Sequence, residues 1–380
     1  MRVRWSGIVM LLGCLPGFAR ADSILPSRSD IDTWLGKLGA NNSFDPAKGI
    51  DWGIMPGPFY TPELGLGIGT AVVGMYRPDP TDHVSQNSTL SLSGYFTSTG
   101  ALGLTFQNYS FFADDQWRFF ADGSLANTPT YYWGQGFSAA KHNHNRQKYT
   151  SQAFTLRPSV QYRIAPATYI GVGWSVASEH AADIHRKSRG TLENEAQGTS
   201  VMSSGASVNI TYDTRDFVPN PHQGQLINLR YTSYSSALGS DSRFDEYETR
   251  YSLYHPVNDK TVVAWEVDGH FTQGHVPWNM LPELGNGQRM RGYYEGRYRD
   301  RDVVSTQVEY RRKLDWRNGI VGWLGTGTMS PSMHQLGQST WLPSVGVGYR
   351  FEFKPGMNVR LDYGVGRSSS GFYFQVGEAF

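Results

Sequence analysis

Cysteine is nearly absent from the sequence, which has one such residue, Cys14, among 380. A single cysteine excludes an internal disulfide and a metal site built from several thiolates. Long apolar runs are also missing, since none reaches the ~18 residues that predict a membrane-spanning helix. Neither sign of charge dominates, because 34 basic residues balance 33 acidic ones and leave a net charge of +1. This balance does not predict nucleic acid or another polyanion as a partner.

Aromatic residues, in contrast, make up 14% of the chain and glycine contributes 43 residues, although the mean hydropathy is only −0.44. This combination is typical of a transmembrane β-barrel. Lipid-facing and lumen-facing residues alternate along each strand of such a barrel, so its apolar surface does not show in an average over the chain.

The N-terminus has the features of an export signal. Two arginines within the first four residues precede a short apolar stretch at residues 8–15, and Ala19 and Ala21 offer the small residues of a cleavage site. We therefore predict a signal peptide over residues 1–21. A membrane anchor is the alternative, but the apolar stretch is too short to span a bilayer. A lipidation motif ending at Cys14 is a further alternative.

Alternation of apolar and polar residues is clearest near the C-terminus. From Val345 to Phe353 every second residue is bulky and apolar, and the residues between them are Gly346, Gly348, Arg350 and Glu352. The pattern recurs at residues 64–72, 207–212, 263–271 and 359–365. A soluble sandwich alternates as well, but glycines and charges of both signs on the polar face favour a water-filled lumen.

The connections between these segments predict the topology. Short turns at residues 98–100, 165–167, 256–259, 315–318 and 354–357 alternate with longer polar loops at residues 77–86, 138–147, 178–199, 272–300 and 329–338. Short periplasmic turns and long extracellular loops are the outer-membrane pattern. We predict one all-β domain at residues 63–380, a single transmembrane antiparallel barrel of about sixteen strands. Eleven strands precede the loop at 272–300 and five follow it, with fourteen strands in total as the alternative. Residues 22–62 would form a periplasmic leader.

Met290-Arg291-Gly292-Tyr293, in the longest loop, resembles the arginine-glycine-aromatic tip of the sixth extracellular loop in the BamA/TamA superfamily of outer-membrane barrels (bacterial surface antigen family). Tyr212 to Asp216, followed by Asn220 to Gly224, resembles that family's turn between strands eight and nine. The C-terminal segment is similar to the family's recognition signal, with Phe372, Phe374, Val376 and Phe380 as its residues, although Glu378 occupies a usually apolar place.

The resemblance implies that Arg291, Gly292 and Tyr293 form a loop latch inside the lumen. A buried guanidinium needs a carboxylate, and we predict Glu352 or Asp362 as its partner, with Glu309 as the third candidate. The alternative is a solvated loop. After the loop the family has an aromatic-x-Asp-x-Gly segment, which appears here as Trp323 to Gly327 without the carboxylate.

The other motif residues have structural roles in our interpretation. Asp213, Arg215 and Asp216 more plausibly shape a turn than carry out chemistry. We find no nucleophile elbow, catalytic triad order or supported pair of catalytic carboxylates, and therefore predict no enzyme, no cofactor and no metal.

By resemblance, the protein aids insertion or translocation of proteins or lipids at the bacterial outer membrane, through weak pairing of its first and last strands. Gly65, Gly67 and Gly69 would weaken the expected first strand. The family's periplasmic polypeptide-transport-associated domains have no room in the predicted leader, which favours the alternative of a passive pore or structural surface protein without insertase activity. The expected partners are outer-membrane lipid and lipopolysaccharide and the assembly machinery that inserts the barrel itself, and a separate periplasmic protein is a further candidate.

Overall fold

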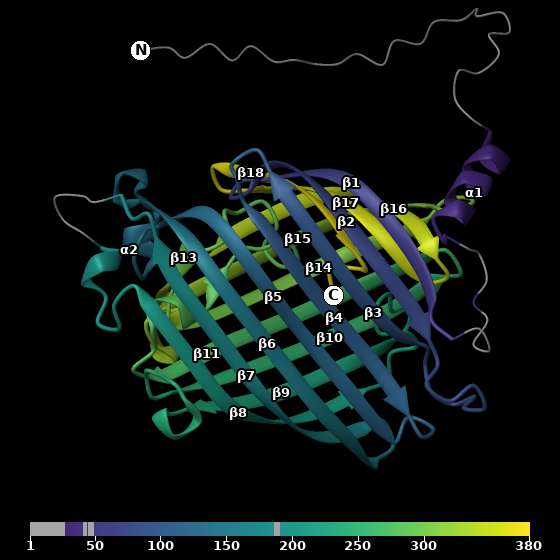
Figure 1. Ribbon diagram of the computed structural model, residues 1–380, viewed down its shortest axis with the longest axis horizontal. Helices are drawn as coiled ribbons and strands as arrows, with labels where there is room; N and C mark the ends of the chain where they lie inside the picture. The colour runs from purple at the N-terminus through teal and green to yellow at the C-terminus, as the bar shows by residue number, and fades with distance from the viewer. Residues whose placement is uncertain (1–26, 41–43, 45–48, 186–190) are drawn as a thin grey trace, which may run out of the picture.

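A computed structural model describes residues 27–40, 44, 49–185 and 191–380, and its strands form a closed antiparallel barrel (Figure 1). The predicted signal peptide lies outside the described residues. The sixteen barrel strands are β1 Asp51–Thr61, β2 Gly65–Tyr76, β3 Ser88–Thr97, β4 Leu102–Phe112, β5 Trp117–Tyr132, β6 Gln147–Ala165, β7 Thr168–Ala182, β8 Ser200–Asp213, β9 Gly224–Tyr234, β10 Phe244–Asn258, β11 Thr261–Gly274, β14 Asp302–Lys313, β15 Asn318–Ser330, β16 Leu342–Lys354, β17 Met357–Gly366 and β18 Ser369–Val376.

Each strand pairs with its neighbour in the chain, β11 pairs with β14, and β18 closes the barrel against β1. The predicted all-β class, the count of sixteen, and the division into eleven strands before the long loop and five after it are confirmed. The long loop itself carries a two-stranded sheet of β12 Glu283–Leu284 and β13 Tyr298–Arg299.

The two faces of the wall follow the alternation in the sequence. Apolar side chains point outward, with Ile68 69% and Val347 65% exposed, whereas Arg350 and Asp362 are buried on the inner side. Successive side chains of a strand point to opposite faces, so one face meets lipid and the other lines the lumen. This arrangement is the one that a transmembrane barrel requires.

The first strand differs from the prediction. β1 begins at Asp51, inside the expected leader, so the predicted barrel start at residue 63 is wrong. Because the prediction placed no strand at Asp51–Thr61, it assigned the first connections to the wrong ends of the barrel. The loop at 77–86 lies at the end of the barrel where β1 begins, and the short turn at 98–100 lies at the opposite end. The glycines at 65, 67 and 69 accordingly belong to the start of β2, not to the first strand.

Helices occur only as short pieces among the described residues. They are α1 Arg28–Lys37, α2 Phe137–Ala140, and the 3₁₀ helices η2 Asn143–Asn145, η3 Leu192–Asn194, η4 Ser236–Leu238, η5 Trp278–Met280 and η6 Met333–Gln338. The side chains of Ser27 and Asp30 form a capping box that starts α1. In the described part of the chain, no helix combines the length and apolar character needed to cross a membrane.

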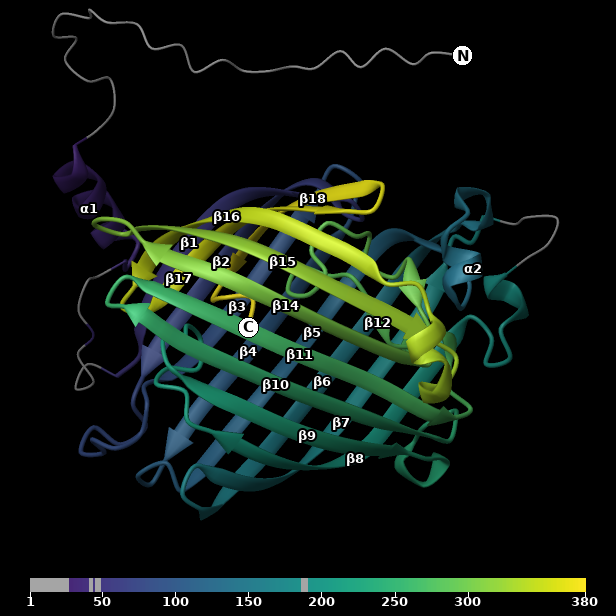
Figure 2. The ribbon, with the colours of Figure 1, turned by 180° about the vertical axis from the view of Figure 1, so that it is seen from behind.

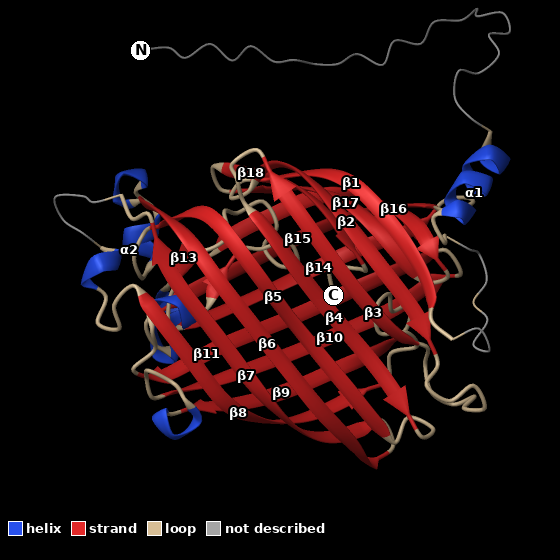
Figure 3. Ribbon diagram, viewed as in Figure 1, coloured by secondary structure: helices blue, strands red, loops and turns tan. Residues whose placement is uncertain are grey.

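α1 lies at the end of the barrel where β1 begins, and the other helices gather at the opposite end (Figure 3). We name the α1 end the periplasmic end, because an even number of strands places both chain ends on that side of an outer membrane. Viewed from behind, β14 to β18 curve along one side of the wall (Figure 2). In both views the C-terminal residue lies within the outline of the barrel.

Candidate functional site

The loop between β11 and β14 folds into the lumen and places Arg291 against the wall. The Arg291 side chain is fully buried, and its Nη1 donates to Asp362 Oδ2 at 2.6 Å. Its Nη2 pairs with Glu309, and the guanidinium stacks 3.7 Å from the ring centroid of Trp323. β14, β15 and β17 thus contact one side chain, which satisfies its charge and covers its flat face.

The prediction that named Glu352 as a partner of Arg291 is wrong. Glu352 lies near the periplasmic end of β16, and its Oε2 is 2.7 Å from Lys313 Nζ. Arg291 instead contacts β16 at Ser344, whose hydroxyl donates to the Arg291 carbonyl at 2.7 Å. Eight residues separate Ser344 from Glu352, about 26 Å along a strand. Both residues face the lumen, but at different depths.

Gly292 and Tyr293 bring the loop backbone directly onto the wall. Gly292 has φ +104°, and a Cβ added there would lie 2.7 Å from backbone atoms of Gly364 and Gly366. Its amide donates to the Tyr373 hydroxyl at 2.9 Å. Tyr293 donates to the Pro343 carbonyl at 2.6 Å, and burial raises the pKa of its phenol, which keeps it a neutral donor. The tip therefore fits by close backbone approach as well as by charge.

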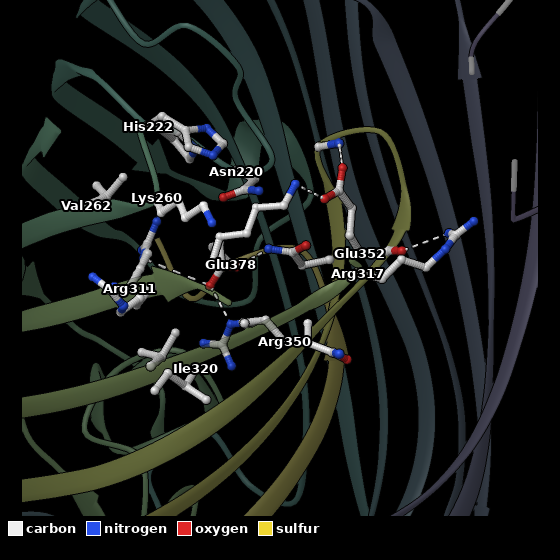
Figure 4. A pocket seen from close by; sticks show the side chains of 18 of the residues that line it. Asn220, His222, Lys260, Val262, Arg311, Arg317, Ile320, Arg350, Glu352 and Glu378 are labelled. Carbon is white, nitrogen blue, oxygen red and sulfur yellow. Dashed lines mark hydrogen bonds and ion pairs between the residues drawn. The ribbon is translucent and has the colours of Figure 1, made fainter. Parts of the chain in front are cut away.

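Further arginines extend this ion-pair network toward the periplasmic end. Asp362 also accepts from Arg350 Nη1 at 2.5 Å, and Arg350 Nε donates to Glu378 Oε2 at 2.7 Å. Arg311 Nε lies 2.9 Å from Glu309 and 3.9 Å from Glu378. Figure 4 shows Glu378 between Arg311 and Arg350, beside a cavity of about 170 Å³. The acidic residue that departs from the family signal thus pairs with lumen arginines.

The C-terminal residues leave the wall after β18. Phe372, Phe374 and Val376 lie on this strand, but Gly377 has φ +84° and turns the chain inward. The Phe380 ring lies 6.1 Å from the ring of Tyr254 on β10. Phe380 is therefore not part of the outward face of the last strand, contrary to the expected alternation.

The turn after β8 is built around one carboxylate. Asp213 accepts from Arg215 Nε at 2.8 Å and from Arg118 Nη1 at 2.8 Å. Asp216 accepts the amide of His222 at 2.9 Å and so closes the turn. Phe217 then reaches across to an apolar cluster that contains Val73 of β2 and Met357 of β17. The turn motif therefore spans part of the periplasmic mouth of the lumen.

The seam between the first and last strands is the weakest junction of the wall. β1 pairs with β2 along all eleven of its residues, but it pairs with β18 only at Tyr60 and Phe372. Nearer the periplasmic end, side chains bridge the gap, and Lys354 Nζ lies 2.9 Å from Asp51 Oδ1. A lumen cavity of about 580 Å³ is lined by residues of β1 and β18, among others.

A group of possible metal ligands occurs on β10 and β11, where Glu246, Glu248 and His270 offer atoms within 4.8 Å of one another. Other side chains already contact these carboxylates. Arg157 Nη1 lies 3.3 Å from Glu248, and Tyr234 donates to Glu246 at 2.8 Å. A nearby guanidinium opposes binding of a second cation, so this group fits an ion-pair cluster better than a metal centre.

Sequence reasoning missed Trp323 as a contact of Arg291 and ranked Glu309 only third. The acids that pair with Arg291 are Asp362 on β17 and Glu309 on β14, and Glu309 lies opposite Trp323 in the register of β14 and β15. The position of Glu309 directly across from Trp323 would have indicated this carboxylate as a partner of Arg291. The sequence alone does not give the register that places these two residues opposite each other.

Comparisons with known proteins bear on the family and the fold of the chain. The profile of the Omp85 superfamily domain matches residues 86–380, and no protein with a curated description matches the sequence. The structure is similar to BamA from Haemophilus ducreyi lacking POTRA domains 1-3, with TM-score 0.52, 14% identity, and coverage of 92% of this chain and 77% of that one.

Two further structures are similar. CdiB from Escherichia coli gives TM-score 0.57 and 12% identity over 88% of this chain and 62% of that one. CdiB from Acinetobacter baumannii gives TM-score 0.51 and 10% identity over 85% of this chain and 58% of that one. This chain therefore spans about three fifths of either CdiB chain, and likeness at such identity shows a shared fold alone.

Proposed function

This chain belongs to the Omp85 superfamily of outer-membrane barrels, and on that premise we propose that it aids insertion or translocation of proteins or lipids at the outer membrane. The family consists generally of non-enzymatic transporters and insertases. The observation that carries the proposal is the seam, where a single paired position joins β1 to β18.

A seam of this kind can open at low cost. Separating β1 from β18 breaks one bridge, whereas separating β1 from β2 breaks a ladder along the whole strand. Strand edges present unpaired N–H and C=O groups that can pair with another chain. The cavity of about 580 Å³ lies behind this junction and gives an incoming segment space on the lumen side.

The contents of the lumen support this role over a passive pore. The loop tip at Arg291 contacts the wall from within, and the segment after Gly377 turns into the lumen toward Tyr254. A permanently open channel would need this space to be free. We propose that Arg291, Gly292 and Tyr293 act as a latch that fixes the loop while the seam works.

Locking the seam tests the proposal. Tyr60→Cys and Phe372→Cys, in a Cys14→Ser background, place two thiols at the paired position, where facing Cα atoms are close enough for a disulfide. The protein in lipid vesicles is given an unfolded outer-membrane barrel protein, and its rate of folding is measured with the disulfide oxidised and reduced. We expect oxidation to abolish the acceleration.

The matched control joins an ordinary strand pair. Ile68→Cys and Phe96→Cys face each other between β2 and β3, and their oxidation should leave the rate unchanged. Equal rates with the seam open and locked would reject the seam as the working site. No acceleration over protein-free vesicles, in either state, would favour the passive alternative. A separate periplasmic partner remains part of the proposal, to be sought by co-purification.

A further inference from the structure

The segment Arg28–Ala40, which contains α1, lies across the periplasmic part of the seam. Its apolar residues Leu35 and Ala40 are 3% and 1% exposed and pack in one cluster with Phe353 of β16 and Val359 of β17. Met55 of β1 and Phe374 of β18 pack against the same cluster. The segment therefore contacts the strands on both sides of the junction.

The same segment pairs with the free edge of β1. The Ile54 amide donates to the Leu38 carbonyl at 2.8 Å. Gly39, with φ +76°, lies so close to the strand that an added Cβ would be 2.0 Å from the Trp52 carbonyl oxygen. Leu38 and Gly39 thus occupy main-chain positions that a neighbouring strand would otherwise take.

Polar contacts fix the segment to the turn between β14 and β15 as well. Arg317 Nε lies 2.9 Å from Asp32 Oδ1, and Arg317 Nη2 donates to the Ala40 carbonyl at 3.0 Å. The indole of Trp316 donates to Asp32 Oδ2 at 2.9 Å. These contacts hold both ends of the Asp32–Ala40 stretch, so its position does not depend on the edge of β1 alone.

The sequence of β1 makes this edge poor in donors. Main-chain groups of alternate residues point to the same edge, so Trp52, Ile54, Pro56, Pro58 and Tyr60 all face the seam. The two prolines have no N–H to donate. Of the remaining three donors, Tyr60 lies at the bridge to β18 and Ile54 is bound by Leu38. The Ile54 contact is therefore a large part of what this edge can form.

We infer that Arg28–Ala40 is a built-in clasp, which occupies the strand-docking edge of β1 and must leave before another extended chain can pair there. The inference rests on the proposed function and adds its regulation. The occupant that displaces the clasp is an extended polypeptide that offers a main-chain oxygen to Ile54 and an apolar side chain to the cluster around Phe353 and Val359.

Two glycines of the clasp give a matched test. Gly39→Ala cannot fit against Trp52, whereas a Cβ at Gly36 within α1 would meet no atom within 4 Å. Hydrogen exchange of the Ile54 amide is measured by mass spectrometry on the full chain in lipid nanodiscs. The short peptide around Ile54 is easy to interpret because Pro56 and Pro58 carry no amide proton.

We expect Gly39→Ala to speed exchange at Ile54 about tenfold or more, and Gly36→Ala to leave it unchanged. Asp32→Ala, which removes a polar anchor without altering β1, should give a similar increase if Gly39→Ala does not fold. Unchanged exchange in Gly39→Ala and Asp32→Ala, or equal increases in Gly36→Ala, would overturn the clasp.

The folding assay in vesicles separates this result from the proposed function. If exchange increases and the folding rate of the client increases too, both proposals stand. If exchange increases but no variant accelerates folding, the clasp stands and the insertase proposal fails.

Discussion

At the scale of single residues, Arg291 shows how the lumen tolerates a dense set of charges. The side chain is fully buried with Asp362 and Glu309, and its guanidinium lies over Trp323. Removing one partner of a buried ion pair is strongly destabilising, because it leaves a charge without compensation. The loop and the wall should therefore be energetically coupled through this residue.

Arg291→Ala tests that coupling. We expect a loss of about 3 kcal/mol in the free energy of unfolding and release of the loop, so that trypsin cleaves the folded protein at Arg297 and Arg299. Arg301→Ala is the control, because Arg301 donates to the Gly274 carbonyl at an exposed position of the same loop. Asp362→Asn combined with Arg291→Ala should cost less than the sum of the single changes. Full resistance of Arg291→Ala to trypsin would contradict the latch.

Gly292→Ala separates shape from charge, since it leaves Arg291 in place. The added Cβ would meet the backbone of β17 at 2.7 Å, in a conformation that alanine rarely adopts. We expect the loop to become sensitive to trypsin, as in Arg291→Ala. Gly322→Ala on β15, where a Cβ meets nothing within 4 Å, should behave like the natural protein. If both alanine variants resist trypsin equally, close packing of the tip is not required.

These residues also show how much of the site could be predicted from the sequence. Arg291 and Asp362 were identified by motif and by face, and the structure brings them together. Periodicity gives the face of a residue but not its depth in the lumen, which is why Glu352 was named and Glu309 ranked below it. Trp323 could be read as part of a motif, but its contact with Arg291 depends on strand register.

At the scale of elements, the assignment of strand residues to the lipid-facing or the lumen-facing side can be tested by substitution with a charged residue. Leu104 and Thr105 are neighbours on β4, with Leu104 52% exposed on the outside and Thr105 lining the lumen cavity. Leu104→Arg should reduce membrane assembly, because arginine on the lipid face costs ~2–4 kcal/mol at the midplane. Thr105→Arg should assemble normally. The measurement is the fraction of protein that migrates as a folded band without heating, and equal fractions would refute the assigned faces.

Alternating strands could be predicted because half-buried strands carry their periodicity in the sequence. β1 could not, since Pro56, Pro58 and its glycines resemble a loop and prolines are tolerated only at a strand edge. Because β1 was not recognised, the loop at 77–86 and the turn at 98–100 were each assigned to the wrong end of the barrel. The clasp was unpredictable for a related reason, because its contacts with β1, β16 and β17 depend on tertiary packing.

At the scale of the whole molecule, the closed wall and the filled lumen predict low conductance. The latch loop, the turn after β8 and the residues after Gly377 all enter the lumen or its periplasmic mouth. In planar lipid bilayers we expect small, brief openings from the natural protein and larger ones from Arg291→Ala. Leu104→Ala, on the outer face, is the control and should not change the current. A large steady conductance of the natural protein would instead support a passive pore.

The single bridge between Tyr60 and Phe372 also has a consequence for the order of folding. Every other pair in the wall joins strands that follow one another in the barrel, whereas this pair joins the first strand to the last. Contacts between distant parts of a chain form late, after nearby hairpins have assembled. Closure is then the final step, and besides side-chain contacts such as that of Lys354 with Asp51 it adds only one main-chain bridge to a sheet that is otherwise complete. The sheet just before closure should be nearly as stable as the closed barrel, so folding ends in a reversible equilibrium that the mature protein can revisit.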